Sequence, residues 1–424
     1  MKLFFYRILM QLLAPVIVLI LLKRKRKGKE DASWKRFKER LGVASVARPE
    51  GKLVWFLCAS VGESLSILPV IEDMKKEDPS LNFLITTTTV SSAAILQKKM
   101  PEYCIHQYVP VDVPSFVKKF MKYWAPDILF NVDSEIWPNL VLRANRTGIR
   151  MGILNARMQD KSFATWKKNM KSANRIFSSY DFAIACDDDS AEKFKYLGIR
   201  DVRSYGNIKS GYAPKSPNKE DIDEFKKLIG NRKFFTVSST HPSVEEEKEV
   251  FRAFEKVLEK HKDALMILAP RHINLASNVE KWAEKDFGFK VAVRSKGEKL
   301  TKDVNVYLAD TMGELNLWYK LADLAFIGGS MHKTLGGHNP MEPAYLDCIV
   351  CAGRNVKTFK ESYDEMEAAG FFKYVDSSDQ LADFILKCFD DEKFLNETKN
   401  KVSKFMREKS KIRTFVIEDV MKFI

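Results

Sequence analysis

Short apolar runs alternate with longer stretches of helical periodicity along most of the chain. Each run is short enough for a buried strand, and each longer stretch would form a helix that crosses back over a sheet. Strands joined by such crossovers pair in parallel. The apolar runs predict strands at 53–59, 82–89, 104–109, 127–133, 149–155, 180–186 and 201–206, and again at 233–239, 264–269, 289–294, 304–308, 323–327 and 348–351.

The stretch 211–218 contains two prolines and breaks this alternation, which is typical of a linker. The sequence therefore predicts an α/β protein with two doubly wound, Rossmann-like parallel sheets that face a ligand cleft. We expect one domain at 29–212 and a second at 213–424, whose last helix packs back on the first. The helical patterns include 63–76, 114–124, 162–178 and 391–423.

Residues 3–22 form the most apolar segment of the chain. A helix of this length is about 30 Å long, enough for the hydrocarbon core of a bilayer. Arg7, Gln11 and Pro15 interrupt the segment, so a helix that lies in the membrane interface remains an alternative to a spanning one. The basic run Lys23-Arg-Lys-Arg-Lys27 follows instead of a signal-peptide cleavage site. We therefore interpret 1–28 as a membrane anchor with a basic flank.

The net charge of +14 is concentrated beside this anchor. Residues 1–42 carry twelve Lys and Arg against three acidic residues, a net charge of +9, and only +5 remains for the other 382 residues. A nucleic-acid-binding protein would carry its excess charge on a folded domain. The distribution instead favours anionic membrane lipids as a partner, and indicates the cytoplasmic side of a membrane.

The six cysteines are scattered, which indicates a reducing compartment rather than a disulfide framework. Cys348-Ile-Val-Cys351 matches a metal or redox spacing, but it lies in an apolar run with no second pair. We expect both cysteines to be buried core residues.

Polar clusters follow the predicted strands, at the ends where doubly wound sheets bind ligands. None of them is a phosphate-binding P-loop or a dinucleotide fingerprint, which excludes the common nucleotide hydrolases and dehydrogenases. The clusters are Ser60-Val-Gly-Glu63, Asp133-Ser-Glu-Ile-Trp-Pro-Asn139, Asn155-Ala-Arg157, Gly206-Asn-Ile-Lys209, Ser239-Thr-His-Pro242, Ala269-Pro-Arg-His272, Asp310-Thr-Met-Gly-Glu314, Gly328-Gly-Ser330 and Gly336-Gly-His-Asn-Pro-Met-Glu342.

Three of these clusters match the capping box of a helix start: 60–63, 311–314 and 339–342. For the last we expect Asn339 as the N-cap, Pro340 as the first helical residue and Glu342 as the partner that closes the box. The glycines before it would let the backbone approach a phosphate. For Glu63 the pattern leaves two interpretations open, a helix cap or a catalytic carboxylate. The loop histidines match no standard zinc spacing, and we expect them to form hydrogen bonds.

The clusters occur in an order that closely resembles the bacterial 3-deoxy-D-manno-oct-2-ulosonic acid (Kdo) transferases of lipopolysaccharide assembly. The resemblance covers nearly the whole chain and implies the GT-B fold. It implies inverting transfer of Kdo from CMP-Kdo to the lipid A precursor (lipid IVA), with neither a bound metal nor a cofactor.

The resemblance also assigns roles to residues. Glu63 would be the general base, and Asp133 and Lys209 would stabilise the transition state. Asp133 departs from the glutamate that is frequent at this position, which shortens its reach. The CMP-sugar would contact Pro270, Arg271, Met312, Gly313, Glu314, Asn339, Pro340, Met341 and Glu342.

Two rival functions remain compatible with the motifs. One is a membrane-associated GT-B transferase with a different nucleotide-sugar donor. The other is a non-catalytic lipid- or nucleotide-binding protein on the same scaffold, although such a protein has no need of the base at Glu63. The number of Kdo residues added does not follow from the motifs.

Overall fold

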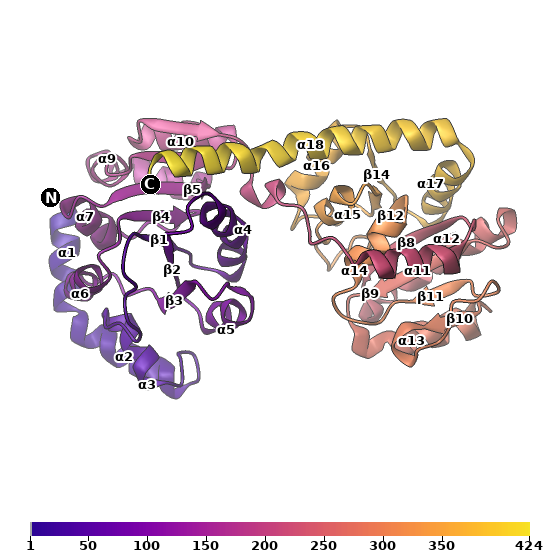
Figure 1. Cartoon of the computed structure of the whole chain (residues 1–424), viewed down its shortest axis with the longest axis horizontal. Helices are drawn as coiled ribbons and strands as arrows, with labels where there is room; N and C mark the ends of the chain where they lie inside the picture. The colour runs from indigo at the N-terminus through magenta and orange to yellow at the C-terminus, as the bar shows by residue number, and fades with distance from the viewer. Residues whose placement is uncertain (1) are drawn as a thin grey trace. The chain divides into compact units, whose positions relative to one another are not determined.

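The computed structural model describes residues 2–424, which form two compact units (Figure 1). The first unit extends to Tyr212 and also includes Ser410–Ile424 at the end of the chain. The second unit is Ala213–Lys409. Each unit contains one seven-stranded parallel sheet, as the alternation of apolar runs predicted.

The sheet of the first unit has the strand order β3-β2-β1-β4-β5-β6-β7. Side chains of β1 alternate between two separate cores, because successive residues of a strand point to opposite faces. Leu53, Trp55 and Leu57 enter one core, and Val54 and Phe56 enter the other. Both faces are thus buried, as parallel sheets require. The strands are β1 (Leu53–Leu57), β2 (Asn82–Thr87), β3 (Cys104–Tyr108), β4 (Ile128–Val132), β5 (Arg150–Ala156), β6 (Phe182–Ala185) and β7 (Asp201–Ser204).

Helices cover both faces of this sheet (Figure 1). Helices α6, α7, α9 and α10 supply side chains to the core that contains Trp55, and α4, α5 and the end of α18 supply the core that contains Phe56. The predicted helix 162–178 is in fact two helices, which separate at Lys168 and Asn169. The helices are α1 (Lys2–Leu12), α2 (Ala14–Arg26), α3 (Trp34–Phe37), α4 (Val61–Glu77), α5 (Val90–Lys99), α6 (Pro114–Trp124), α7 (Pro138–Arg146), α8 (Asp160–Lys167), α9 (Met170–Phe177) and α10 (Asp188–Leu197).

The sheet of the second unit has the order β10-β11-β9-β8-β12-β13-β14. Its edge strand β14 was missed by the sequence analysis, because three residues with only one fully buried side chain lack a strand pattern. The strands are β8 (Phe234–Thr240), β9 (Leu265–Pro270), β10 (Val291–Val293), β11 (Val306–Leu308), β12 (Leu324–Ile327), β13 (Ile349–Ala352) and β14 (Phe372–Tyr374). The helices are α11 (Lys219–Ile229), α12 (Glu246–Lys260), α13 (Ala276–Lys281), α14 (Leu315–Leu321), α15 (Met341–Tyr345), α16 (Lys360–Ala368), α17 (Ser378–Asp390) and α18 (Glu392–Lys422).

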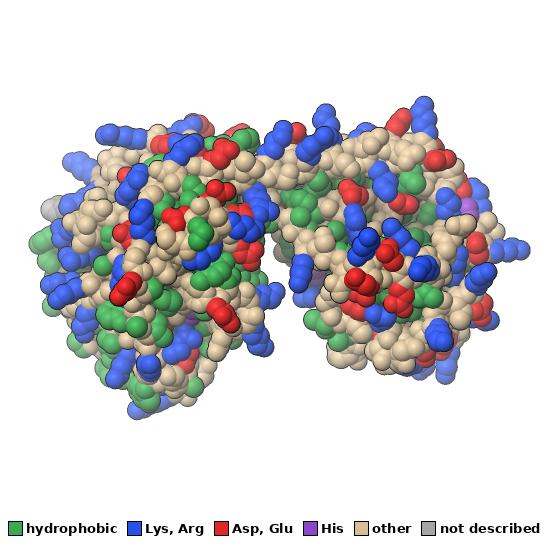
Figure 2. Space-filling view, in the orientation of Figure 1, with side chains coloured by type: hydrophobic (Ala, Val, Ile, Leu, Met, Phe, Trp, Pro, Cys, Tyr) green, Lys and Arg blue, Asp and Glu red, His purple; other side chains and the backbone are tan. Residues whose placement is uncertain are grey.

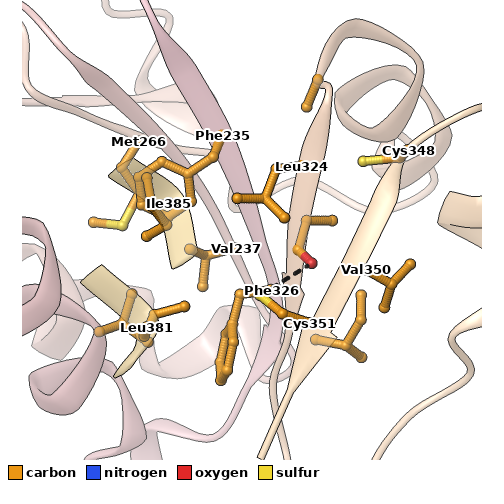
Figure 3. Packing of buried hydrophobic residues seen from close by; sticks show 14 of the residues in the cluster. Phe235, Val237, Met266, Leu324, Phe326, Cys348, Val350, Cys351, Leu381 and Ile385 are labelled. Atoms are coloured by element: carbon orange, nitrogen blue, oxygen red, sulfur yellow. Dashed lines mark hydrogen bonds between the residues drawn. The ribbon is translucent and has the colours of Figure 1, made fainter. Parts of the chain in front are cut away.

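Side chains of β8, β12, β13 and α17 build the main core of the second unit (Figure 3). Cys348 and Cys351 are buried and carry free thiols, and the thiol of Cys351 points toward the main-chain oxygen of Ala325 at 3.7 Å. The expectation of buried core cysteines is therefore confirmed.

The last helix, α18, contributes side chains to cores of both units. Val402 and Met406 belong to the main core of the second unit, whereas Ile412 and Val416 belong to a core of the first. In the first unit, Arg413 forms a bidentate ion pair with Asp73 of α4.

The N-terminal segment forms two helices instead of one. Among residues 2–424, no single helix is both long and apolar enough to cross a bilayer, and α1 and α2 reach that length only together, with a bend of 58° between them.

Candidate active site

Two adjacent strands of the first sheet end at predicted catalytic residues. β1 and β4 pair in parallel, and the strand order reverses between them. Connections leave such a switch point on opposite faces of the sheet, which opens a crevice beyond the carboxyl ends of the strands. Glu63 follows β1 in the first turn of α4, and Asp133 follows β4 directly. Both residues thus lie where doubly wound sheets bind ligands.

The carboxylate of Glu63 is hydrogen-bonded to the start of its own helix. Its Oε1 accepts from the hydroxyl of Ser60 at 2.7 Å, and its Oε2 accepts from the N–H of Ala59 at 2.6 Å. In return the hydroxyl oxygen of Ser60 accepts the N–H of Glu63 at 3.3 Å and caps α4. The structure therefore confirms that this motif caps the start of α4.

Capping leaves Glu63 with unused capacity to accept a proton. An ionised carboxylate offers about four acceptor positions, and one hydrogen bond to each oxygen leaves half of them open. Glu63 is only half-buried, and the preceding residue is an exposed glycine, Gly62. A substrate hydroxyl can approach the carboxylate without displacing Ser60 or Ala59. The two interpretations of Glu63 are therefore compatible in one conformation.

Asp133 adopts a backbone conformation that is uncommon for a residue with a side chain. Its φ is +65°, and its N–H donates to the main-chain oxygen of Leu154 at 2.9 Å. Burial raises the pKa of this carboxyl group, the charge of Glu63 raises it further, and the cations Lys209 and Arg157 lower it. Strained residues of this kind persist where the surroundings hold them in place, often at functional sites. The structure thus brings two carboxyl groups and two cationic side chains together at one sheet edge.

Lys209 follows β7 in a short 3-10 helix, Ile208–Gly211, and its side chain is exposed. A Cβ atom at Gly62 would lie 4.0 Å from Nζ of Lys209 and 4.0 Å from Oγ of Ser60. The ammonium group therefore lies beside the first turn of α4. This places Lys209 near Glu63 as well as Asp133.

Asn155 and Arg157 belong to a motif noticed in the sequence, but the sequence analysis assigned them no role. The side-chain oxygen of Asn155 accepts the N–H of Ile208 at 2.9 Å, which anchors the turn that carries Lys209. Asn155 is buried and has a φ of +53°, a conformation in which Asn is enriched. An asparagine at the end of a predicted strand was the available signal, but its partner lies 53 positions away.

In the second unit, the predicted donor residue Arg271 follows β9. Its N–H donates to the main-chain oxygen of Thr240 at 2.9 Å, and its side chain is exposed. Three histidines gather nearby. Nε2 of His241 lies 2.9 Å from Nε2 of His338, and the rings of His241 and His272 are 5.2 Å apart. The pKa of His338 is lowered to about 4, mainly by burial and further by the charges of His241, Arg271 and His272.

His241 and His338 form a hydrogen bond with each other, as expected for His338, and His332 contacts the hydroxyl of Thr334 at 2.8 Å. In the part of the chain that the structure describes, no three His, Cys, Asp or Glu side chains are grouped to hold a metal ion.

That glycines 328, 329, 336 and 337 let the backbone approach a ligand stays a prediction, but packing within the unit already leaves no room for a side chain there. A Cβ atom at Gly328 would lie 2.6 Å from the backbone of Thr240, and one at Gly337 would lie 2.9 Å from the backbone of Val356. Side chains of His338 and Thr358 crowd the other two positions. The glycines are needed because the protein packs against itself there.

The backbone N–H groups of this glycine loop are already occupied. The buried carboxylate of Glu246 accepts the N–H groups of Gly329 at 2.6 Å, Ser330 at 3.0 Å and Met331 at 3.0 Å. Successive N–H groups of this kind form an anion site. Because Glu246 fills it, these three groups do not serve as a phosphate cradle.

The predicted helix start at Asn339 is displaced by one residue. α15 begins at Met341, Pro340 occupies the cap position, and the helix has only five residues. Asn339 still accepts the N–H of Met341 at 3.1 Å and donates to Glu342 at 3.3 Å, so the two ends of the expected box do meet. The side chain of Met341 is buried.

The predicted capping box Thr311–Glu314 forms only in part: the hydroxyl of Thr311 donates to the carboxylate of Glu314, but the helix starts later. α14 begins at Leu315, and Arg294 binds the carboxylate of Glu314 with two hydrogen bonds of 2.7 and 3.2 Å. This interaction lowers the pKa of Glu314. Met312 is exposed and Gly313 has a φ of +90° with open space around its Cα.

Two parallel sheets of Rossmann-like topology, each followed by polar clusters beyond a switch point, are the architecture of the GT-B fold class. A solved structure with this fold is the UDP-GlcNAc 2-epimerase of Neisseria meningitidis bound to UDP-GlcNAc. It matches with a TM-score of 0.57 at 15% identity and covers 87% of this chain and 100% of its own.

The chain belongs to the 3-deoxy-D-manno-octulosonic-acid transferase (Kdo transferase) family, as the motifs predicted. The family model matches residues 35–211. A probable mitochondrial 3-deoxy-D-manno-octulosonic acid transferase of Arabidopsis thaliana is 33% identical over 372 residues, which are 86% of this chain and 82% of the relative. The transferase of Rickettsia bellii is also 33% identical, over 81% of each chain, and that of Haemophilus influenzae is 28% identical over 89% and 88%.

Proposed function

We propose that this transferase moves Kdo from CMP-Kdo to the lipid A precursor, lipid IVA, with inversion at the anomeric carbon and without a metal ion. The observation that carries the proposal is the group formed by Glu63, Asp133 and Lys209 at the switch point of the first sheet. A sugar hydroxyl that attacks needs a base, an acid and a cation, with room to approach them. These three residues lie beside the exposed Gly62.

Glu63 acts as the general base. A sugar hydroxyl has a pKa far above neutrality, so its oxygen becomes nucleophilic only as the proton leaves. Oε1 or Oε2 of Glu63 takes that proton while the hydroxyl oxygen bonds to the anomeric carbon of Kdo. The bond from that carbon to the phosphate oxygen of CMP breaks on the opposite face, and CMP departs with the electron pair.

Cations stabilise the charge that develops on the leaving group. CMP is already a stable anion, so it needs electrostatic stabilisation more than protonation. Lys209 supplies a positive charge on the acceptor side, and Asp133 helps to orient it. On the donor side, the exposed guanidinium of Arg271 suits a phosphate, because it offers two parallel N–H donors. The donor also contacts Pro270, the 312–314 loop and the 339–342 turn.

The transferase works at the cytoplasmic face of the bacterial inner membrane. The first helices and their basic flank attach it there, where both the lipid acceptor and anionic headgroups are present. The cytosol supplies the soluble nucleotide sugar.

The test is incubation of the purified full-length protein with lipid IVA and CMP-Kdo, followed by mass spectrometry of the lipid. We expect one or more mass increments of Kdo, and their number reports how many residues are added. An unchanged lipid mass would refute this acceptor and donor. Competition by CMP against UDP then separates this donor from other nucleotide sugars.

A further inference from the structure

One face of α1 is fastened to the first unit. The hydroxyl of Tyr6 donates to Oδ2 of the buried Asp112 at 3.0 Å. The amide of Gln11 donates to the hydroxyl of Ser115 at 3.2 Å and accepts the N–H of the same residue at 3.0 Å. Leu3 packs against the core of the unit. A helix that crossed a bilayer would have to give up these contacts, because its whole circumference would meet lipid.

The opposite face of the two helices consists of exposed apolar side chains. Their exposed fractions lie between 38% and 72%, although large apolar side chains in contiguous groups seldom face water. Their spacing of three or four positions is that of a helix face. We call this face the apolar stripe; it consists of Phe4, Phe5, Ile8, Leu9, Leu12, Leu13, Val16, Leu19 and Ile20.

Basic and aromatic side chains adjoin the apolar stripe. α2 ends in the basic run 23–26. The exposed Trp34 lies under the ammonium group of Lys25, which is 4.8 Å from the ring centroid. In Figure 2, hydrophobic and basic side chains occur together along the outer edge of the first unit, where Figure 1 places α1 to α3. An apolar face with cations and tryptophan at its margin is typical of helices that lie in a membrane interface.

We propose that α1 and α2 lie in the plane of an anionic bilayer surface, with the apolar stripe immersed and α1 still fastened to the first unit. This inference rests on the proposed location at a membrane. The 58° bend fits it, because the stripe follows the curved side of the unit rather than a straight path through a bilayer.

In-plane attachment also couples the lipid surface to the candidate active site. Oδ1 and Oδ2 of Asp112 accept the N–H groups of Leu140 and Asn139 in the first turn of α7, at 2.9 and 3.0 Å. The loop that enters α7 begins at Asp133. Tyr6, Asp112 and the first turn of α7 thus form one hydrogen-bonded connection, which holds the acceptor-side residues at a set height above the lipid headgroups.

The side of the membrane on which residue 2 lies tests the proposal. Lys2→Cys and Lys27→Cys place single accessible thiols at the two ends of the anchor, since all six native cysteines are buried. A membrane-impermeant maleimide is applied to sealed inverted and sealed right-side-out inner-membrane vesicles. We expect both variants to react only in inverted vesicles. Reaction of Lys2→Cys only in right-side-out vesicles would show a spanning helix and overturn the proposal.

Flotation with liposomes separates membrane binding itself from immersion of the apolar stripe. Wild-type protein should float with vesicles of phosphatidylglycerol and phosphatidylethanolamine, and less with phosphatidylcholine alone. Leu12→Ser with Leu19→Ser should weaken binding on the order of a hundredfold, from the apolar area no longer immersed. The control pair Leu228→Ser with Ile273→Ser, also partly exposed but outside the stripe, should bind normally.

The possible failures are distinguishable. Wild-type protein that does not float refutes the membrane location itself. Flotation that both serine pairs leave unchanged refutes immersion of the stripe but leaves the location intact. Neither readout requires Kdo transfer, so a wrong substrate assignment would not affect them.

Discussion

The hydroxyl of Ser60 donates a hydrogen bond to the carboxylate of Glu63 at 2.7 Å, while its oxygen caps the helix on which Glu63 lies. The same two side chains therefore begin α4 and hold the proposed base in place. A base that is held before substrate arrives loses little conformational entropy in the reaction, which is the advantage of a preorganised site.

Replacement of the base provides the first prediction. Glu63→Gln should lower the rate of Kdo transfer by about 10²- to 10⁴-fold, the usual contribution of a general base. Affinity for CMP, measured by calorimetry, should stay unchanged, because the donor residues lie on the second sheet. The amide oxygen can still accept one of the two hydrogen bonds, so the melting temperature should change little.

Two serine variants control for the capping role of this motif. Ser60→Ala removes a cap and should destabilise the protein by about 1 kcal/mol. Ser377→Ala removes an equivalent cap, with the same 3.3 Å bond, at the start of α17. Both should lose similar stability, and only Ser60→Ala should also reduce transfer. If Glu63→Gln lost stability and activity in parallel, the glutamate would be purely structural.

Gly62 tests whether the space beside α4 belongs to the acceptor. A Cβ atom there would come no closer than 4.0 Å to another group, so Gly62→Ala should fold normally. It should even stabilise the helix by up to about 1 kcal/mol, since alanine is the better helix former. The added methyl group lies beside Lys209, and we expect a raised KM for the lipid acceptor in steady-state kinetics. Unchanged kinetics would show that the acceptor binds elsewhere.

Arg271 is expected to dominate CMP binding. Hydrogen bonds to a charged group contribute about 1.5–3 kcal/mol, so Arg271→Ala should weaken CMP affinity by roughly tenfold or more. Arg271→Lys should restore only part of it, because an ammonium group lacks the paired donors. Arg252→Ala is the matched control, an exposed arginine of the same unit that pairs with Glu249. Equal effects of both alanine variants would indicate a non-specific loss of charge.

Glu247 should make the stability of the second unit depend on pH. Its side chain is fully buried, and neither carboxylate oxygen has a hydrogen-bond partner among the residues that the structure describes. Burial raises its pKa to about 7. The folded state then binds more protons than the unfolded state between about pH 4.5 and 7. Stability should therefore be highest below this window and decrease as the pH rises through it, by on the order of 3 kcal/mol.

Denaturant unfolding at a series of pH values measures this effect. Glu247→Gln cannot ionise, so its stability should lose this part of the pH dependence. Glu249→Gln, at the surface of the same helix, should retain the wild-type profile. An unaltered profile in Glu247→Gln would mean that the carboxyl group finds a partner in solution.

The motifs of the first unit show where prediction from sequence succeeds. β1 and β4 could be recognised because every residue in them is buried, so that the apolar run itself marks the strand. Because the strands are parallel, all their carboxyl ends fall on one edge of the sheet, and Glu63, Asp133 and Lys209 could be expected there. Asn155 could not be recognised as the anchor of the Lys209 turn, since its hydrogen bond joins positions that no local pattern connects.

The second unit shows where such prediction fails. Glycines 328 and 337 were expected to let the backbone approach a phosphate, but close packing against Thr240 and Val356 is what leaves no room for a side chain at these positions. Glu246, in the first turn of α12, accepts the N–H groups that a phosphate would need. The side chains of Thr311 and Glu314 do meet, but α14 begins only at Leu315, and Arg294 binds the same carboxylate with two hydrogen bonds.

The sequence by itself determined the two parallel sheets, the family and the strand ends at which the candidate site residues lie, because hydrophobic periodicity and short motifs are local properties of a chain. Only the tertiary structure decided which partners the polar groups at those ends meet. It also decided that one face of α1 is hydrogen-bonded to Asp112 and Ser115 while the other is left apolar and exposed. Hydrogen bonds and burial depend on distances between residues that are far apart in the chain, and those distances exist only after folding.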